Sequence, residues 1–305
     1  MNSIQFAPII VGTMRLGEWG SKMNLIELEK FVNDCLEIGL NDFDHADIYG
    51  HYSTENDFGK LLKHNPSLRQ KMQITTKGGI CLTTERKPKF FTNFYNNTKT
   101  HLIQQVEDSL QNLETDYLDL YLVHRPDFLM DPYDIAEAFS QLRTQGKVKH
   151  FGVSNFTPIQ FDILNSIFPL ETNQVEISIT RQDAFEDGTL LQCQKNRISP
   201  TAWSPLGGGK VFGKTEDQKI LRIQKVGIEL AEKYQVGLDQ ILLAWLLKHP
   251  SRIIPVIGTS AFPGHRCATC LANAPEILLA SLSDLTLYAP LIHLTLHTAA
   301  SQCSF

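Results

Sequence analysis

Short apolar runs alternate along the chain with longer segments in which apolar residues recur every three or four positions. The short runs are typical of buried strands, and the longer segments are typical of amphipathic helices. The predicted strands cover residues 9–11, 40–44, 73–77, 118–123, 150–153, 172–176, 198–203 and 253–257. The predicted helices cover residues 23–38, 54–62, 98–113, 133–144, 157–166, 190–196, 220–234 and 238–248.

The alternation of strands with helices favours parallel pairing, because two parallel strands need a long crossover that is usually a helix. A count of eight strands predicts an α/β fold of the single (β/α)8 (TIM) barrel type. Residues 118–123 are almost all apolar, as expected of a strand that is buried on both faces. There is no internal repeat and no low-complexity linker, so we expect one barrel domain over residues 1–260.

Polar or small residues stand at the end of, or within, most of the predicted strands. In (β/α)8 barrels the functional groups gather at the carboxyl ends of the strands, where the βα loops emerge. The pattern therefore predicts one functional pocket at that end of the barrel, and its candidate residues are Asp44, Lys77, His124, Ser154, Asn155, Gln174, Trp203, Gly258 and Thr259.

Composition excludes several other classes of protein. The 305 residues carry a net charge of -5 without a long basic block, so a nucleic-acid partner is not expected. No apolar run reaches the roughly 18–20 residues that span a bilayer, and the first residues do not form a secretory signal. The six cysteines fit a reducing compartment. We expect a cytoplasmic protein without a metal site, whose partner is a small molecule.

Four proton-handling residues could act together on a carbonyl group. A free tyrosine has a pKa of about 10, and a nearby ammonium group lowers that value toward the working range. We therefore assign Tyr49 as the acid and base, Lys77 as the group that tunes it, and Asp44 as the anchor of Lys77. His124 would orient the substrate oxygen. Each also has a structural alternative, such as a turn cap for Asp44 or a solvated strand end for Lys77.

Several motifs in the right order resemble the aldo-keto reductase superfamily, and within it the bacterial YdhF-type oxidoreductases. They are His-Ala-Asp-Ile-Tyr-Gly, Thr-Lys-Gly-Gly, Leu-Tyr-Leu-Val-His-Arg-Pro-Asp, Lys-His-Phe-Gly-Val-Ser-Asn-Phe and Pro-Val-Ile-Gly-Thr-Ser. The resemblance covers residues 9–260 and implies a (β/α)8 barrel that reduces an aldehyde or ketone with NADPH or NADH, usually NADPH. It places the catalytic tetrad of that family on Asp44, Tyr49, Lys77 and His124.

The resemblance also implies a set of cofactor contacts. The carboxamide of a nicotinamide needs donors and acceptors, and a flat apolar face must lie behind its ring; Trp203 would be that face, although a lone tryptophan is often a core residue. Asn155 could equally cap the following helix. The implied cofactor residues are Gly12, Thr13, Met14, Ser154, Asn155, Gln174, Trp203, Ser204, Pro205, Leu206, Gly207, Gly258, Thr259 and Ser260. Trp19 and the loops 80–95 and 128–132 would shape the substrate pocket.

Two other functions fit parts of the sequence. Residues 208–215 read Gly-Gly-Lys-Val-Phe-Gly-Lys-Thr, which satisfies the Walker A pattern of P-loop NTPases. Pro205 and further residues separate this motif from the preceding strand, and no apolar strand that ends in aspartate follows it. The second alternative keeps the barrel but not the turnover, as in the cofactor-sensing regulatory subunits that the same superfamily contains. The complete tetrad favours the enzyme.

Residues 261–305 form an atypical C-terminal segment. They hold only three charged residues, against 58 in the preceding 260, and half of the cysteines, including Cys267 and Cys270. The family normally continues after Gly-Thr-Ser with a basic residue that holds the 2′-phosphate of NADPH, and only Arg266 could substitute here. Our hypothesis is a divergent or frameshifted reading, with a weak or absent eighth helix.

Overall fold

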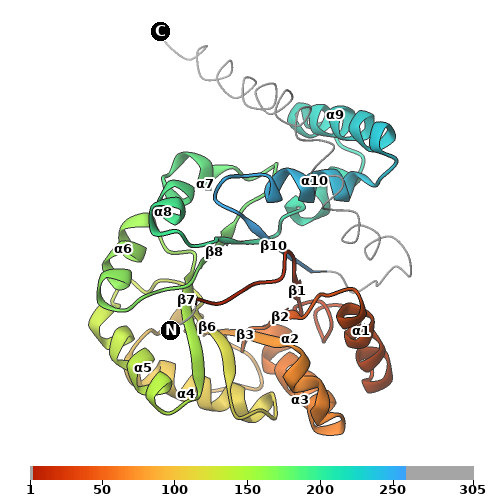
Figure 1. The fold of residues 1–305 in the computed structure, drawn as a ribbon. Coiled ribbons are helices and arrows are strands. Elements are labelled where there is room, and N and C mark those ends of the chain that lie inside the picture. Colours follow the sequence, from red (N-terminus) through yellow and green to blue (C-terminus); the bar gives the residue numbers. More distant parts are fainter. Residues whose placement is uncertain (1–2, 259–305) are drawn as a thin grey trace.

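The computed structural model describes residues 3–258 of the chain. Eight parallel strands form a closed barrel in which the last strand pairs with the first (Figure 1). In order around the barrel they are β1 (Ile10–Gly12), β2 (Asp42–Asp44), β3 (Gln73–Gly78), β6 (Leu118–Val123), β7 (Val148–Ser154), β8 (Asn173–Glu176), β9 (Thr201–Trp203) and β10 (Ile254–Ile257). The predicted (β/α)8 barrel is confirmed.

Strand β6 is buried along its whole length because both of its faces are covered. On β6, Tyr121 belongs to the large core cluster between the barrel and its helices, whereas Leu120 and Leu122 form a separate cluster with Ile4. This alternation follows from the two-residue period of a strand. Phe6 packs on both inner clusters of the barrel. The segment before β1 therefore contributes apolar side chains to the inside of the barrel.

Helices surround the barrel (Figure 1). They are α1 (Leu25–Glu37), α3 (Thr54–His64), α4 (Lys99–Asn112), α5 (Pro132–Thr144), α6 (Pro158–Ile167), α8 (Thr189–Asn196), α9 (Gln218–Tyr234) and α10 (Leu238–Leu247). Local sequence sets several of their starts: Asn24 and Glu27 form a capping box at α1, and Thr157 with Gln160 form another at α6. Because Thr157 caps α6, Asn155 is free of the capping role that its sequence left open.

The structure adds short elements that the apolar pattern did not predict. Strands β4 (Ile80–Cys81) and β5 (Phe94–Tyr95) form an antiparallel pair after β3. Short helical turns occur at η1 (Pro66–Lys71), α2 (Tyr49–Tyr52), α7 (Asp183–Glu186) and η2 (Gly207–Phe212). These segments are too brief to show a hydrophobic period. The tail 261–305, and with it the prediction that the eighth helix is weak or absent, lies outside the described residues.

Within residues 3–258, no helix combines the length and the apolar character that crossing a membrane requires.

Candidate active site

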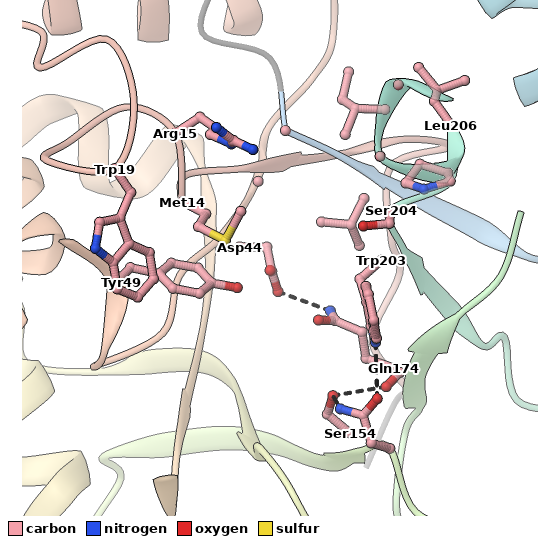
Figure 2. Close-up of a pocket in the computed structure, with 18 of the residues that line it drawn as sticks. Met14, Arg15, Trp19, Asp44, Tyr49, Ser154, Gln174, Trp203, Ser204 and Leu206 are labelled. Atoms are coloured by element: carbon pink, nitrogen blue, oxygen red, sulfur yellow. Dashed lines mark hydrogen bonds between the residues drawn. The ribbon is translucent and has the colours of Figure 1, made fainter. Parts of the chain in front are cut away.

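A cavity of about 770 Å³ opens at the carboxyl ends of the barrel strands. Figure 2 shows Trp19 and Tyr49 on one side of it, Gln174 and Trp203 on the other, and Asp44 between them. Most lining residues lie in or directly after the barrel strands, and others come from β4, η2 and helix α10. They are Gly12, Met14, Arg15, Trp19, Asp44, Ile48, Tyr49, Ile80, His124, Arg125, Ser154, Asn155, Gln174, Trp203, Ser204, Pro205, Leu206, Gly208, Gly209, Phe212, Asp239, Leu243, Val256, Ile257 and Gly258.

Lys77 is the hub of the polar group at the floor of this cavity. Its side chain is 1% exposed, and its Nζ donates to Asp44 Oδ2 at 2.5 Å, to the His45 carbonyl at 2.8 Å and to the Tyr49 hydroxyl at 3.3 Å. Burial lowers the pKa of Lys77, but the charges of Asp44 and Tyr49 and their hydrogen bonds raise it, so that it lies above its ordinary value. Lys77 is therefore a fixed ammonium group.

Tyr49 has its hydroxyl at this ammonium group, as the sequence predicted, but its pKa moves the other way. Burial raises the pKa of Tyr49, the charge of Lys77 lowers it, and the carboxylate of Asp44 raises it again; the balance lies above the ordinary value. The predicted direction of the Lys77 effect is confirmed, whereas the predicted net lowering is wrong because the cost of burying a phenolate is larger. Tyr49 is consequently a neutral phenol that can donate a proton.

His124 faces Tyr49 across the cavity, with 6.3 Å between the two ring centroids. Burial lowers the pKa of His124 well below its ordinary value, and the charges of Lys77 and Arg125 lower it further. The imidazole is therefore neutral near pH 7. Its Nδ1 has no hydrogen-bond partner in the described part of the protein. A neutral imidazole can orient an oxygen by hydrogen bonding without adding a charge.

A row of amides and hydroxyls lines the side of the cavity opposite Tyr49. Asn155 Nδ2 donates to Ser154 Oγ at 2.8 Å, and Trp203 Nε1 donates to Asn155 Oδ1 at 3.0 Å. Gln174 Nε2 donates to Asp44 Oδ1 at 3.0 Å, and Ser154 Oγ donates to the backbone carbonyl of Gln174. Figure 2 shows the bond between Gln174 and Asp44 as a dashed line. The row thus connects the amides to the carboxylate that holds Lys77.

Backbone conformation at the cavity is unusual on this side. Asn155 and Ser204 are non-glycine residues with φ of 60° and 50°, in the left-handed region that such residues seldom occupy. Gly208 and Gly209, with φ of 65° and 85°, line the cavity, and a Cβ atom on either would meet nothing within 4 Å. Left-handed residues of this kind cluster at binding sites, where surrounding contacts hold them.

The Walker A motif does not fold as a P-loop. Its first residues lie in η2, and the helix after it, α9, begins only at Gln218 with Asp217 as its N-cap. A P-loop places its Lys-Thr pair at the start of a helix, where the phosphates meet the N-terminal amides. Here the carboxylate of Asp217 accepts those amide hydrogens. The NTPase interpretation of residues 208–215 is wrong.

Four predicted cofactor residues are not among the residues that line the cavity. Thr13 is fully buried and binds the Asp44 carbonyl and His45 Nδ1, so it supports the β2 end from behind. Gly207 is buried next to the cavity lining. Thr259 and Ser260 lie outside the described residues. All other predicted cofactor residues, and Trp19, line the cavity.

Several lining residues were not predicted from the sequence, among them Arg15, Arg125 and Asp239. Arg125 directly follows His124, and its guanidinium lies 6.0 Å from the centre of the Trp203 ring. The position of Arg125 just after a predicted strand is a sequence signal that could have identified it as a lining residue. No local pattern marks Asp239, which lies in the first turn of α10. Of the loops expected to shape the pocket, residues 80–95 contribute Ile80, and residues 128–132 are not among the lining residues.

The fold and the site together define a (β/α)8 barrel whose open end holds a buried lysine, a carboxylate and a phenol in one hydrogen-bonded group. Residues 8–262 match the model of the aldo/keto reductase family. This chain therefore belongs to that family, and it is an oxidoreductase of the aldo-keto reductase class.

Two relatives show how far the similarity extends. The chain is 43% identical over 267 residues to oxidoreductase YdhF of Escherichia coli, which covers 87% of each chain. It is 38% identical over 261 residues to a 6-dehydroglucose reductase of Agrobacterium fabrum, which covers 85% of this chain and 86% of that one. A crystal structure of a thermostable aldo-keto reductase with the inhibitor epalrestat has a TM-score of 0.73 at 25% identity, over 91% of this chain and 95% of that chain.

Proposed function

We propose that the protein reduces an aldehyde or ketone to an alcohol with NADPH, and that Tyr49 donates the proton to the substrate oxygen. The observation that carries this proposal is the position of the Tyr49 hydroxyl, 3.3 Å from a lysine ammonium that Asp44 holds at 2.5 Å. Tyr49 and Asp44 line a cavity of about 770 Å³, within the usual range for cofactor and ligand sites.

The chain supplies the proton and the geometry for this reaction. When bound, a nicotinamide cofactor supplies the hydride. The neutral phenol of Tyr49 donates its proton as negative charge develops on the substrate oxygen, and the ammonium of Lys77 stabilises the phenolate that forms. The carboxylate of Asp44 keeps Lys77 charged. His124, neutral and across from Tyr49, donates a hydrogen bond that orients the same oxygen.

The opposite side of the cavity fits a nicotinamide. Asn155 and Gln174 present amide donors and acceptors of the kind that pair with a carboxamide, and Ser154 adds a hydroxyl. Trp203 offers a flat face, fixed by its bond to Asn155. The glycines at 208 and 209 leave open space beside the cavity, where a bulky charged group could approach the backbone.

The experiment is a fluorescence titration with NADPH and with NADH, followed by a screen of aldehydes under saturating cofactor. We include 6-dehydroglucose, because a relative at 38% identity carries that activity in its name. We expect tighter binding of NADPH than of NADH, and cofactor oxidation that depends on the aldehyde. Tight binding without turnover of any aldehyde would instead favour a cofactor-sensing subunit.

A further inference from the structure

Three loops meet on the substrate side of the cavity, next to Tyr49. They are the loop after β1, which carries Glu18 and Trp19, the turn after β2 that begins at Tyr49, and the loop between β4 and β5, which carries Arg86. Trp19 lies beside Tyr49, with 6.2 Å between their ring centroids (Figure 2). The geometry of the proton donor therefore depends on how these three loops are held together.

The turn after Tyr49 has a strained backbone. Gly50, His51 and Tyr52 follow one another with φ of 58°, 54° and 67°. Two consecutive non-glycine residues in the left-handed region are rare, and such a conformation persists only where surrounding contacts impose it. Contacts from another segment must therefore hold this turn.

Arg86 supplies several of those contacts from one guanidinium group. Its Nη1 donates to the Gly50 carbonyl at 3.3 Å and to the His51 carbonyl at 3.1 Å. The same nitrogen donates to Glu18 Oε2 at 3.0 Å. In addition, Tyr52 exchanges hydrogen bonds through its hydroxyl with the backbone of Leu82, on the same loop as Arg86. The loop between β4 and β5 thus forms hydrogen bonds with the strained turn at both of its ends.

The contacts continue from Arg86 to the wall of the cavity. Glu18 Oε1 lies 3.1 Å from His51 Nδ1, and Trp19 Nε1 lies 3.3 Å from both ring nitrogens of His51. The Trp19 and His51 rings are perpendicular, with 5.2 Å between their centroids. The indole N–H therefore meets the imidazole, and the position of Trp19 depends on the turn that Arg86 holds.

We infer that Arg86 is a positioning residue of the carbonyl reaction: it clamps the turn after Tyr49 and, through Glu18 and His51, the indole of Trp19. This inference rests on the proposed function for its effect on turnover. The clamp acts on the acid and on the substrate wall, and it touches none of the residues on the opposite, amide-lined side. Arg86 is thus a determinant of kcat and of substrate KM, and the affinity for cofactor is independent of it.

A structural contribution alone would give a different result. The Arg86 side chain is 50% exposed and its partner Glu18 is 38% exposed, and exposed ion pairs contribute little to stability. The melting temperature should therefore hardly change when Arg86 is replaced. Misplacing a catalytic group by about 1 Å, in contrast, can lower the rate by about a hundred-fold.

The test compares Arg86→Ala and Arg86→Lys with Lys89→Ala, which removes the same charge from an exposed position of the same loop. We expect Arg86→Ala to lower kcat/KM for an aldehyde by roughly ten- to a hundred-fold, through both a lower kcat and a higher KM. Arg86→Lys should keep part of the kcat/KM that Arg86→Ala loses, because an ammonium group can still donate to the two carbonyls. The Kd for NADPH and the activity of Lys89→Ala should stay at the wild-type level.

Hydrogen exchange gives a readout that needs no turnover. The amides of Tyr52 and Ser53 donate to the carbonyls of Ile48 and Tyr49, and we expect them to exchange faster in Arg86→Ala but not in Lys89→Ala. Unchanged exchange at these amides overturns the clamp, and so does an unchanged kcat/KM in an active enzyme. A wild-type protein that reduces no carbonyl overturns the proposed function, and the exchange result still decides the clamp.

Discussion

Replacing Tyr49 with phenylalanine removes one hydroxyl and leaves the ring beside Trp19 in place. Lys77 then loses only its longest hydrogen bond, at 3.3 Å, and keeps those to Asp44 at 2.5 Å and to the His45 carbonyl at 2.8 Å. No buried charge is left without a partner. The free energy of unfolding should therefore change by no more than about 1 kcal/mol, whereas the rate of reduction should fall by roughly 10²–10⁴-fold.

The assay measures kcat for an aldehyde under saturating NADPH, the Kd for NADPH by fluorescence, and unfolding by urea. Tyr95→Phe, on the exposed strand β5, is the matched control. Lys77→Met is the contrasting variant: among residues 3–258 it leaves the buried Asp44 carboxylate with only the Gln174 amide as partner, which should cost about 3–5 kcal/mol of stability. A Tyr49→Phe enzyme that is folded and within about three-fold of wild-type activity would remove Tyr49 from its role.

Three further predictions concern pH and the cofactor. Tyr49 must be protonated to donate, and its pKa is raised, so the rate of reduction should stay constant through neutral pH and fall only at alkaline pH. His124 is already neutral in this range. An inflection of the rate near pH 6.5, about the ordinary pKa of imidazole, that disappears in His124→Asn would contradict this prediction. Burial raises the pKa of Asp42 to about 6, so folding takes up a proton at this carboxyl group. The stability that this bound proton provides is lost as pH rises through about 6. Asp42→Asn should therefore gain roughly 2–3 kcal/mol relative to wild type between about pH 4 and pH 7 in urea unfolding, and a constant difference would refute it. Asn155→Ala should weaken NADPH binding by about ten-fold, measured by fluorescence titration, because it removes an amide of the proposed carboxamide site and releases Trp203; an unchanged Kd would place the nicotinamide elsewhere.

The hydrophobic pattern was sufficient for the fold because each barrel element carries its own local signal. Residues 118–123 were predicted and observed as a strand with the same bounds, and capping residues such as Asn24 and Thr157 set helix starts directly. Strand ends were less well predicted: the strand expected at residues 198–203 begins only at Thr201. Pairing with neighbouring strands decides where a strand begins and ends, and the local sequence does not encode that pairing.

In the candidate site, too, some features follow from the sequence and others depend on the folded structure. The order of strands alone places Asp44, Lys77 and His124 at one end of the barrel, because all parallel strands of a barrel point the same way. Contacts between distant residues could not be predicted from order alone. Gln174 binds Asp44 from 130 positions away. Arg86 reaches a turn in which His51 and Tyr52 are left-handed, although neither residue type signals that conformation.

The pattern of residues is enough to predict the type of barrel and the four residues that meet at its open end. The electrostatics of those four residues depend on how the folded chain packs around them. An ammonium group beside a phenol favours the phenolate wherever it stands, but the cost of removing both from water depends on every atom packed around them. That cost set the pKa of Tyr49 above its ordinary value, and burial cannot be summed from residue types along a chain.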